Sequence, residues 1–125
     1  MIPSKTPANR LRILIVDDVP QVLADLGLLL DLDPQFEVVG SAMNGLDAIQ
    51  KAESLRPELI LMDLEMPVMD GFSAARIIKF NNPDFKIAAL SIHSQSIDRE
   101  RALEAGFDLF IEKGTPLDGV LKSFL

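Results

Sequence analysis

The sequence predicts an α/β fold in which helices cover both faces of a five-stranded, mainly parallel sheet. Short apolar runs alternate with helix-like segments along the chain, which is typical of such folds. Three of the runs are almost continuously apolar, as expected for strands that are buried on both faces. Four runs also end on polar side chains that can handle a phosphate or a metal.

This alternation gives five strands and five helices within one domain. We expect the strands at 11–16, 36–41, 58–62, 86–91 and 107–112. We expect the helices at 20–32, 45–55, 71–80, 97–105 and 116–124. Residues 1–9 are expected to form a flexible leader and residues 10–125 a single domain, since 125 residues is near the commonest domain size.

Local signals mark several helix ends. Pro20 suits the first turn of the first helix, and Asn44 suits the start of the second. Gly106 is expected to end the fourth helix. Before the last helix, Thr115 is the expected N-cap, with Pro116 at the first helical position.

Helical periodicity predicts which side chains are buried. In the first helix we expect a buried stripe of Val22, Leu23, Leu26, Leu29 and Leu30. Leu28 then points away from the core, flanked by Ala24 and Leu32. The last helix should bury Leu117, Val120, Leu121 and Phe124. The fourth helix offers little to bury beyond Ile97, Ala102, Leu103 and Ala105.

Charged residues indicate the order of the strands. Glu37 lies in the second strand, and Asp108 and Glu112 lie in the fifth, so these two strands belong at the edges. Right-handed crossovers then favour the order 2-1-3-4-5, as in flavodoxin-like folds. In such a sheet, ligands bind outside the carboxyl ends of the strands, here between the first and third.

Composition excludes several classes of function. The chain has no cysteine, so it can form no disulfide or thiolate metal site. It has a net charge of −7 and no cluster of Lys or Arg, so we expect no binding to nucleic acid by this domain. Its apolar stretches are too short for a bilayer span, and a cytoplasmic location is expected.

Polar residues at the strand ends should converge on one pocket. Asp17 and Asp18 follow the first strand, Asp63 the third, Ser91 the fourth and Lys113 the fifth. Each alone has an ordinary explanation as a turn, cap or surface residue. Three clustered carboxylates, however, repel one another, and a divalent cation with oxygen ligands relieves that repulsion. The set suits metal-assisted phosphoryl transfer.

Within this pocket, Asp63 is the candidate nucleophile, because a central carboxylate can attack phosphorus and form an acyl phosphate. Lys113 would pair its positive charge with the phosphoryl oxygens. Phe110 alternates with Asp108 and Glu112 on the wetter side of an edge strand, where a large aromatic is unexpected. It either packs under the fourth helix or has two alternative positions.

From Arg10 to Leu125 the chain resembles the receiver domain of two-component response regulators. The resemblance rests on five strand-end residues, on the MPVMDG loop and on one aromatic three residues before the lysine: Asp17, Asp18, Asp63, Ser91, Lys113 and Phe110. The run KGTPLDGVL further resembles the subfamily that carries a C-terminal helix-turn-helix output domain.

The resemblance implies that Asp63 accepts a phosphoryl group from a histidine kinase or histidine phosphotransfer protein. Magnesium or manganese would be held by Asp18, Asp63 and the main-chain carbonyl of Glu65, with Asp17 assisting through water. Such a domain is a signalling switch that catalyses only its own phosphorylation and autodephosphorylation.

The resemblance also implies how the signal leaves the domain. Ser91 would move to bond the phosphoryl group while Phe110 turns inward, which alters the face made by the fourth helix, fifth strand and fifth helix. A phosphorylation-dependent homodimer is one expected outcome. Leu28 and Ala24 form the expected docking surface for the histidine-bearing partner.

Two other functions stay open from the residues. A haloacid-dehalogenase-like phosphatase also uses an Asp nucleophile with Ser, Lys and magnesium, but its second acid lies two residues on, which Asp63 and Glu65 match only in part. A flavodoxin-like FMN binder would need a phosphate loop after the first strand, where Asp17 and Asp18 would repel phosphate instead.

Overall fold

The computed structural model describes residues 10–92 and 96–125, so the expected leader at 1–9 lies outside the described part. The strands are β1 (Leu11–Val16), β2 (Phe36–Ala42), β3 (Leu59–Asp63), β4 (Lys86–Ser91) and β5 (Leu109–Glu112). The helices are α1 (Pro20–Asp31), α2 (Gly45–Leu55), α3 (Gly71–Asn81), α4 (Ser96–Ala105) and α5 (Leu117–Leu121), and a 3₁₀ turn over Lys122–Phe124 follows α5. The predicted element order is confirmed.

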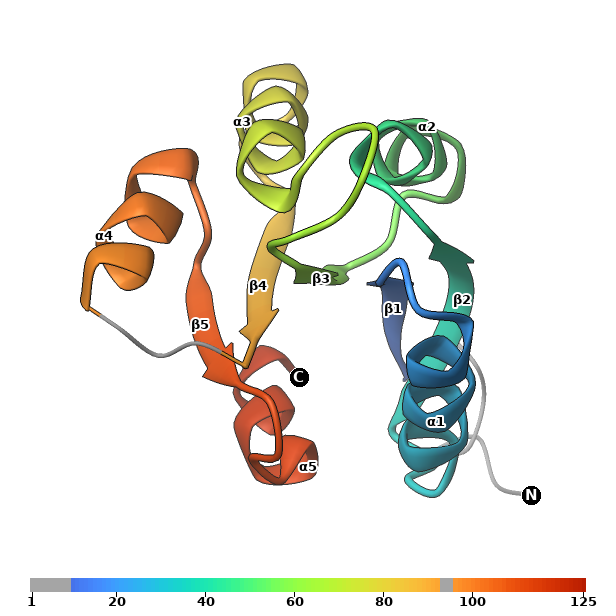
Figure 1. Ribbon diagram of the computed structural model, residues 1–125. Coiled ribbons are helices and arrows are strands. Elements are labelled where there is room, and N and C mark those ends of the chain that lie inside the picture. The colour runs from blue at the N-terminus through green and yellow to red at the C-terminus, as the bar shows by residue number, and fades with distance from the viewer. Residues whose placement is uncertain (1–9, 93–95) are drawn as a thin grey trace.

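The sheet is parallel and has the order β2-β1-β3-β4-β5, as predicted. Helices α2, α3 and α4 cover one face, and α1 and α5 cover the other (Figure 1). Successive residues of a strand point to opposite faces, so β1 sends Leu14 and Val16 into one core cluster and Ile13 and Ile15 into the other. Both faces of the central strands are therefore buried, which explains their continuous apolar runs.

Several predicted helix signals are confirmed. Pro20 lies in the first turn of α1, and the side chain of Asn44 caps α2 by accepting a hydrogen bond from the Asp47 N–H at 2.9 Å. Gly106 follows α4 with a φ of +103°, a conformation that glycine adopts without strain. The predicted stripe of the last helix packs on the core throughout.

Thr115 does not cap the last helix, so that prediction is wrong. α5 begins at Leu117, and Pro116 is its N-cap residue without a side-chain bond. The Thr115 N–H instead donates to the Glu112 carbonyl at 3.1 Å, and Gly114 has a φ of +96°. This turn carries the chain away from the strand before the helix can begin.

β5 begins two residues later than expected, at Leu109. The side chain of Asp108 accepts the Ile87 N–H at 2.9 Å and the Lys79 ammonium at 2.8 Å. The Asp108 carboxylate thus accepts the Ile87 N–H in place of a backbone carbonyl, so the regular strand pairing starts after Asp108. Through Lys79, the same carboxylate links α3 to the edge of the sheet.

Two predicted core residues are exposed. Leu29 of α1 is 52% exposed and Leu103 of α4 is 75% exposed. In the predicted α1 stripe only Leu30 is fully buried, while Val22, Leu23 and Leu26 are half-buried. The side chain of Ile97, also predicted to be buried, lies outside the described residues.

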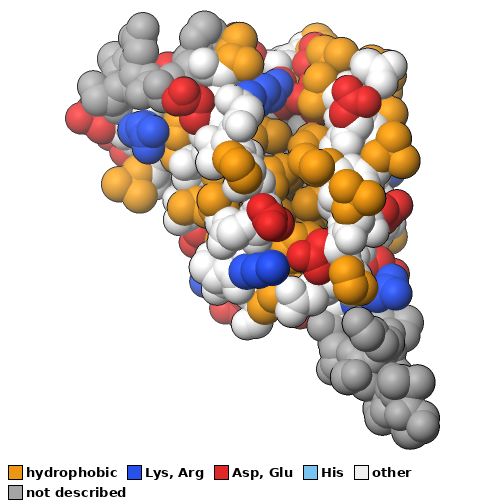
Figure 2. Space-filling model, turned by 90° about the horizontal axis from the view of Figure 1, so that it is seen from below, with side chains coloured by type: hydrophobic (Ala, Val, Ile, Leu, Met, Phe, Trp, Pro, Cys, Tyr) orange, Lys and Arg blue, Asp and Glu red, His pale blue; other side chains and the backbone are white. Residues whose placement is uncertain are grey.

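The exposure of Leu29 follows from a hollow between α1 and α5. This cavity of about 800 Å³ is lined mainly by apolar side chains, among them Leu29, Leu30, Leu32, Phe36, Pro116 and Leu117. Figure 2 shows apolar side chains gathered in such a hollow on this face. Because α5 has a single regular stretch of five residues, it covers only part of the α1 side of the core.

Among the helices that the structure describes, none is both long and apolar enough to span a membrane.

Candidate functional site

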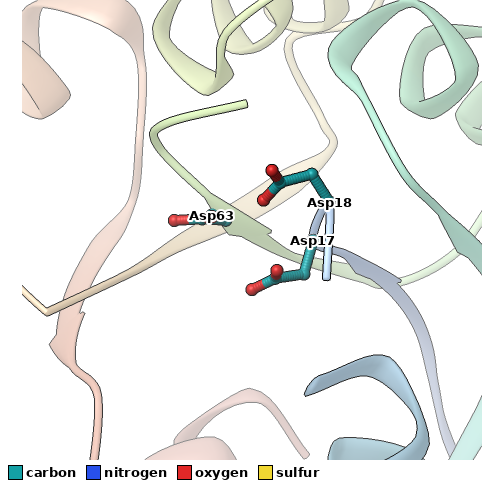
Figure 3. A group of neighbouring side chains, drawn as sticks. All are labelled: Asp17, Asp18 and Asp63. Atoms are coloured by element: carbon teal, nitrogen blue, oxygen red, sulfur yellow. The ribbon is translucent and has the colours of Figure 1, made fainter. Parts of the chain in front are cut away.

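The three predicted acids come together at the carboxyl end of the sheet. Asp17 and Asp18 directly follow β1, and Asp63 is the last residue of β3. These strands are parallel neighbours with Val16 opposite Met62, so Asp17 and Asp63 lie at the same level. One carboxylate oxygen from each of the three acids lies within 4.8 Å of the others. Figure 3 shows the three side chains together at the ends of β1 and β3. The predicted convergence is confirmed.

Lys113 joins this cluster, as the sequence predicts. Its ammonium donates to Asp17 Oδ2 at 3.1 Å and lies 3.9 Å from Asp63 Oδ1. Asp17 is 1% exposed, and its other oxygen accepts the Val19 N–H at 3.0 Å. The sequence does not predict the hydrogen bond from the Val19 N–H to Asp17, because this bond depends on how the chain turns after β1. Both oxygens of Asp17 are thus already engaged by the protein.

Ser91 reaches the same edge from β4 and is 5% exposed. The Lys113 N–H donates to the Ser91 carbonyl at 2.7 Å, which extends the pairing of β4 and β5 by one residue. Ser91 also lines a cavity of about 280 Å³ with the side chains of Glu65, Met66, Asp70 and others. This cavity lies next to Asp63, because its lining includes the two residues that follow Asp63 in the chain.

The loop after β3 folds back closely over the site. The backbone of Glu65 and Leu64 lies beside the Asp63 carboxylate and acts to lower its pKa. At the end of the loop, the Gly71 N–H donates to the Leu64 carbonyl at 2.9 Å. A Cβ at position 71 would lie 2.3 Å from the Asp63 carbonyl oxygen, so only glycine fits this approach. Asp70 then caps α3 by accepting the Ser73 N–H at 2.8 Å. These contacts explain why the loop ends in Asp70 and Gly71.

Burial raises the pKa of the Asp63 carboxyl from 3.8 to about 6. The ammonium of Lys113 opposes this rise in pKa, and the negative charge of Asp17 adds to it. Because the side chain of Asp63 is only 13% exposed, solvent screens these effects little. Near neutral pH the ionised, nucleophilic form of Asp63 predominates. Burying this negative charge lowers the stability of the folded protein.

The raised pKa predicts that this carboxylate destabilises the fold as pH rises. Between pH 4 and 6 the folded protein binds more protons at Asp63 than the unfolded chain does, so the free energy of unfolding falls through this range. We expect the full penalty of about 2–3 kcal/mol near pH 7 without metal. Urea unfolding of wild type and Asp63→Asn from pH 5 to 7.5 measures it. The difference in stability between the two proteins should grow with pH, and a constant difference would contradict the raised pKa.

The residues predicted to act at a distance from the acids have mixed outcomes. Phe110 is half-buried and packs against the core cluster under α2, α3 and α4, which agrees with the packing explanation. Its two alternative positions stay a prediction. Leu28 is 70% exposed and lines a shallow depression between α1 and β2 together with Ala24. Leu28 is therefore on the surface, as predicted.

The donor atoms fit a hard divalent cation. Carboxylate oxygens are the ligands that magnesium prefers, and magnesium commonly takes one or two of them. Asp18 and Asp63 are half-buried, whereas Asp17 is already bonded to Lys113 and Val19. Three carboxylates against one ammonium leave an excess of negative charge, which a cation would offset.

Comparison with known sequences gives the family. The family model for the response regulator receiver domain matches residues 13–124. The chain is 42% identical over 106 residues to a protein-glutamate methylesterase/protein-glutamine glutaminase of Pseudoalteromonas translucida, over 82% of this chain and 26% of that protein. It is 35% identical over 113 residues to the response regulator protein VraR of Staphylococcus saprophyticus, over 90% of this chain and 54% of VraR. The chain thus spans about half the length of these curated relatives or less.

Solved structures agree with this assignment. The signal receiver domain of a response regulator NarL from Mycobacterium tuberculosis superimposes with a TM-score of 0.86 and 25% identity, over 93% of this chain and 97% of that one. The response regulator domain of Thermotoga maritima CheB gives a TM-score of 0.82 and 28% identity, over 92% and 93%. These matches favour the receiver over the phosphatase and the flavin binder. With its acidic cluster, its strand-end lysine and its sheet order, the chain belongs to the response regulator receiver domain family.

Proposed function

We propose that this receiver is switched by phosphorylation of Asp63, with the phosphoryl group coming from a phosphohistidine on a histidine kinase or phosphotransfer protein. The observation that carries the proposal is the placement of Asp63 beside two further acids and within 3.9 Å of the Lys113 ammonium. The carboxylate can act as a nucleophile, and the ammonium can neutralise the charge that the phosphoryl group brings.

The chemical step is a displacement at phosphorus. A carboxylate oxygen of Asp63 forms a bond to phosphorus while the bond from phosphorus to the donor's imidazole nitrogen breaks. The electron pair of the broken bond stays on that nitrogen. Lys113 pairs with a phosphoryl oxygen, and Ser91, at the end of the neighbouring strand, bonds another after it moves toward the group. Alignment and charge neutralisation supply the catalysis.

The proposed metal ligands are Asp18, Asp63 and the main-chain carbonyl of Glu65. Asp17 acts through water, in keeping with its bonds to Val19 and Lys113. When bound, magnesium or manganese supplies positive charge to the phosphoryl oxygens and offsets the repulsion between the acids.

Magnesium should therefore stabilise the folded protein and be required for phosphorylation. At a concentration about ten times its Kd, it should add roughly 1–2 kcal/mol of stability and raise the Tm by several degrees. The measurement is a thermal melt with and without magnesium, together with phosphoryl uptake from acetyl phosphate with and without EDTA. Asp18→Asn should abolish the Tm shift, whereas the exposed Asp31→Asn should preserve it. A wild-type Tm unmoved by millimolar magnesium would rule out the site.

The proposed output is a shift in population between two arrangements of α4, β5 and α5, coupled to phosphorylation through Ser91 and Phe110. We propose regulation of transcription as the final effect, because a solved LuxR-family two-component response regulator from Aurantimonas superimposes with a TM-score of 0.83 and 28% identity. A phosphorylation-dependent homodimer and a cytoplasmic location stay predictions.

The docking surface for the histidine-bearing partner is proposed at Leu28 and Ala24. Both side chains are exposed on α1, the helix that follows Asp18 in the chain. An apolar side chain that is 70% exposed there can be buried by a helical partner.

Leu28→Asp should slow phosphoryl transfer from the cognate protein by about tenfold or more, since losing one apolar contact of this size costs about 1.5–3 kcal/mol. Transfer from acetyl phosphate should be unchanged, because Leu28 lies outside the acidic cluster. Phe80→Asp on α3 is the matched control, since Phe80 is 88% exposed and outside the proposed surface. If both variants accept the group from the partner as fast as wild type, Leu28 has no role in docking.

A further inference from the structure

In the part of helix α4 whose side chains the structure describes, residues 98–105, few side chains are buried against the rest of the domain. Among its residues whose side chains the structure describes, only Ala102 and Ala105 are buried, and Leu103 is 75% exposed. Two alanines bury little apolar area, so they stabilise the helix only weakly against the sheet. Other contacts must therefore contribute to its position.

Two arginines of α4 supply such contacts. The guanidinium carbon of Arg99 lies 4.7 Å from the ring centre of Phe110 on β5. That of Arg101 lies 4.1 Å from the ring centre of Phe72 at the start of α3. In the described part of the chain, neither guanidinium forms an ion pair with a carboxylate. A cation over an aromatic face is attracted by the ring quadrupole, so both contacts hold α4 in place.

The two rings differ in their freedom to move. Phe72 is 5% exposed and packs edge-on against Phe107, with ring centres 6.4 Å apart and an interplanar angle of 85°. Phe110 is only half-buried, on an edge strand. Phe72 is therefore held in place on α3, and the contact of Arg101 with it does not involve the ring of Phe110. Arg99 keeps its contact only while the ring of Phe110 stays in its present, half-buried place.

We propose that Arg99 is a positioning residue that holds Phe110 in the half-buried place described above and so opposes activation. This rests on the proposed function, in which Phe110 turns inward after phosphorylation. The inward arrangement loses the contact with Arg99, so the contact favours the unphosphorylated state alone. At an exposed site such a contact shifts the balance between the two states by about two- to fivefold. Arg101 instead ties α4 to Phe72 on α3, through a contact that does not involve Phe110.

The test is a titration with beryllofluoride and magnesium, which mimic an acyl phosphate on Asp63. NMR signals of β5 amides report the midpoint, which is the beryllofluoride concentration at which half of the protein has changed state. Arg99→Gln should lower the midpoint by about two- to fivefold, because binding of the mimic no longer has to break the contact between Arg99 and Phe110. Arg99→Lys keeps a cation and should stay close to wild type. Arg76→Gln, at an exposed arginine of α3, is the matched control and should leave the midpoint unchanged.

The partner of Arg99 is tested by repeating the substitution in a Phe110→Leu background, where Arg99→Gln should no longer move the midpoint. Equal midpoints for wild type and Arg99→Gln would overturn the role of Arg99, and so would an equal shift in the Phe110→Leu background. A wild-type protein that does not respond to beryllofluoride at all would instead overturn the phosphorylation of Asp63, so the two failures can be told apart.

Discussion

Replacing Lys113 with methionine should cost about 1–3 kcal/mol of folding stability and slow phosphoryl uptake by about 100-fold. The stability loss follows because Asp17 is 1% exposed and would lose the ion pair that it forms with Lys113. Removing one member of a fully buried pair costs about 3–5 kcal/mol, and the estimate for Lys113 is lower since its side chain is 25% exposed. The rate loss follows because a positioned charge on the phosphoryl oxygens disappears.

The matched control is Lys122→Met. The Nζ of Lys122 lies 3.8 Å from Asp33 Oδ2, but the lysine side chain is 47% exposed. Loss of this ion pair should therefore lower the stability by less than about 1 kcal/mol. Urea unfolding measures the stability of both variants, and acetyl phosphate with magnesium measures their uptake. Magnesium should also stabilise Lys113→Met more than wild type, because the metal then offsets more negative charge. If Lys113→Met matches Lys122→Met in both measurements, the ammonium does not organise the acids.

The acidic cluster could be predicted because it depends on topology alone. Asp17, Asp63, Ser91 and Lys113 each come at the end of an apolar run, and parallel strands place such ends on one edge. Glu37 and Glu112 marked the edge strands, since charged side chains are tolerated there. Together with right-handed crossovers, these observations give the sheet order and the site without any side-chain geometry.

The surfaces of the helices could not be predicted in the same way. Periodicity places Leu29 on the buried side of α1, but whether that side is covered depends on how far α5 extends. The exposure of Leu103 similarly depends on how α4 packs against its neighbours. The contacts of Arg99 with Phe110 and of Arg101 with Phe72 join different elements, so no local sequence pattern predicts them. Sequence periodicity gives the face of a helix, and tertiary packing decides what covers it.

Asp63→Asn should abolish phosphorylation completely, the largest effect expected of any substitution in this protein. Asparagine has nearly the same shape as aspartate, and its amide cannot form the acyl phosphate. The neighbouring acids should not take over. Asp17 is bonded through both oxygens to Val19 and Lys113, and Asp18 is proposed as a metal ligand.

Intact-protein mass spectrometry of wild type and Asp63→Asn, after incubation with acetyl phosphate and magnesium, tests the phosphorylation of Asp63 most directly. Wild type should gain the mass of one phosphoryl group, and reduction of the acyl phosphate with borohydride should map it to Asp63. Asp63→Asn, folded by circular dichroism, should gain none. Uptake of a phosphoryl group by Asp63→Asn, or mapping of the wild-type group to another residue, would contradict the assignment.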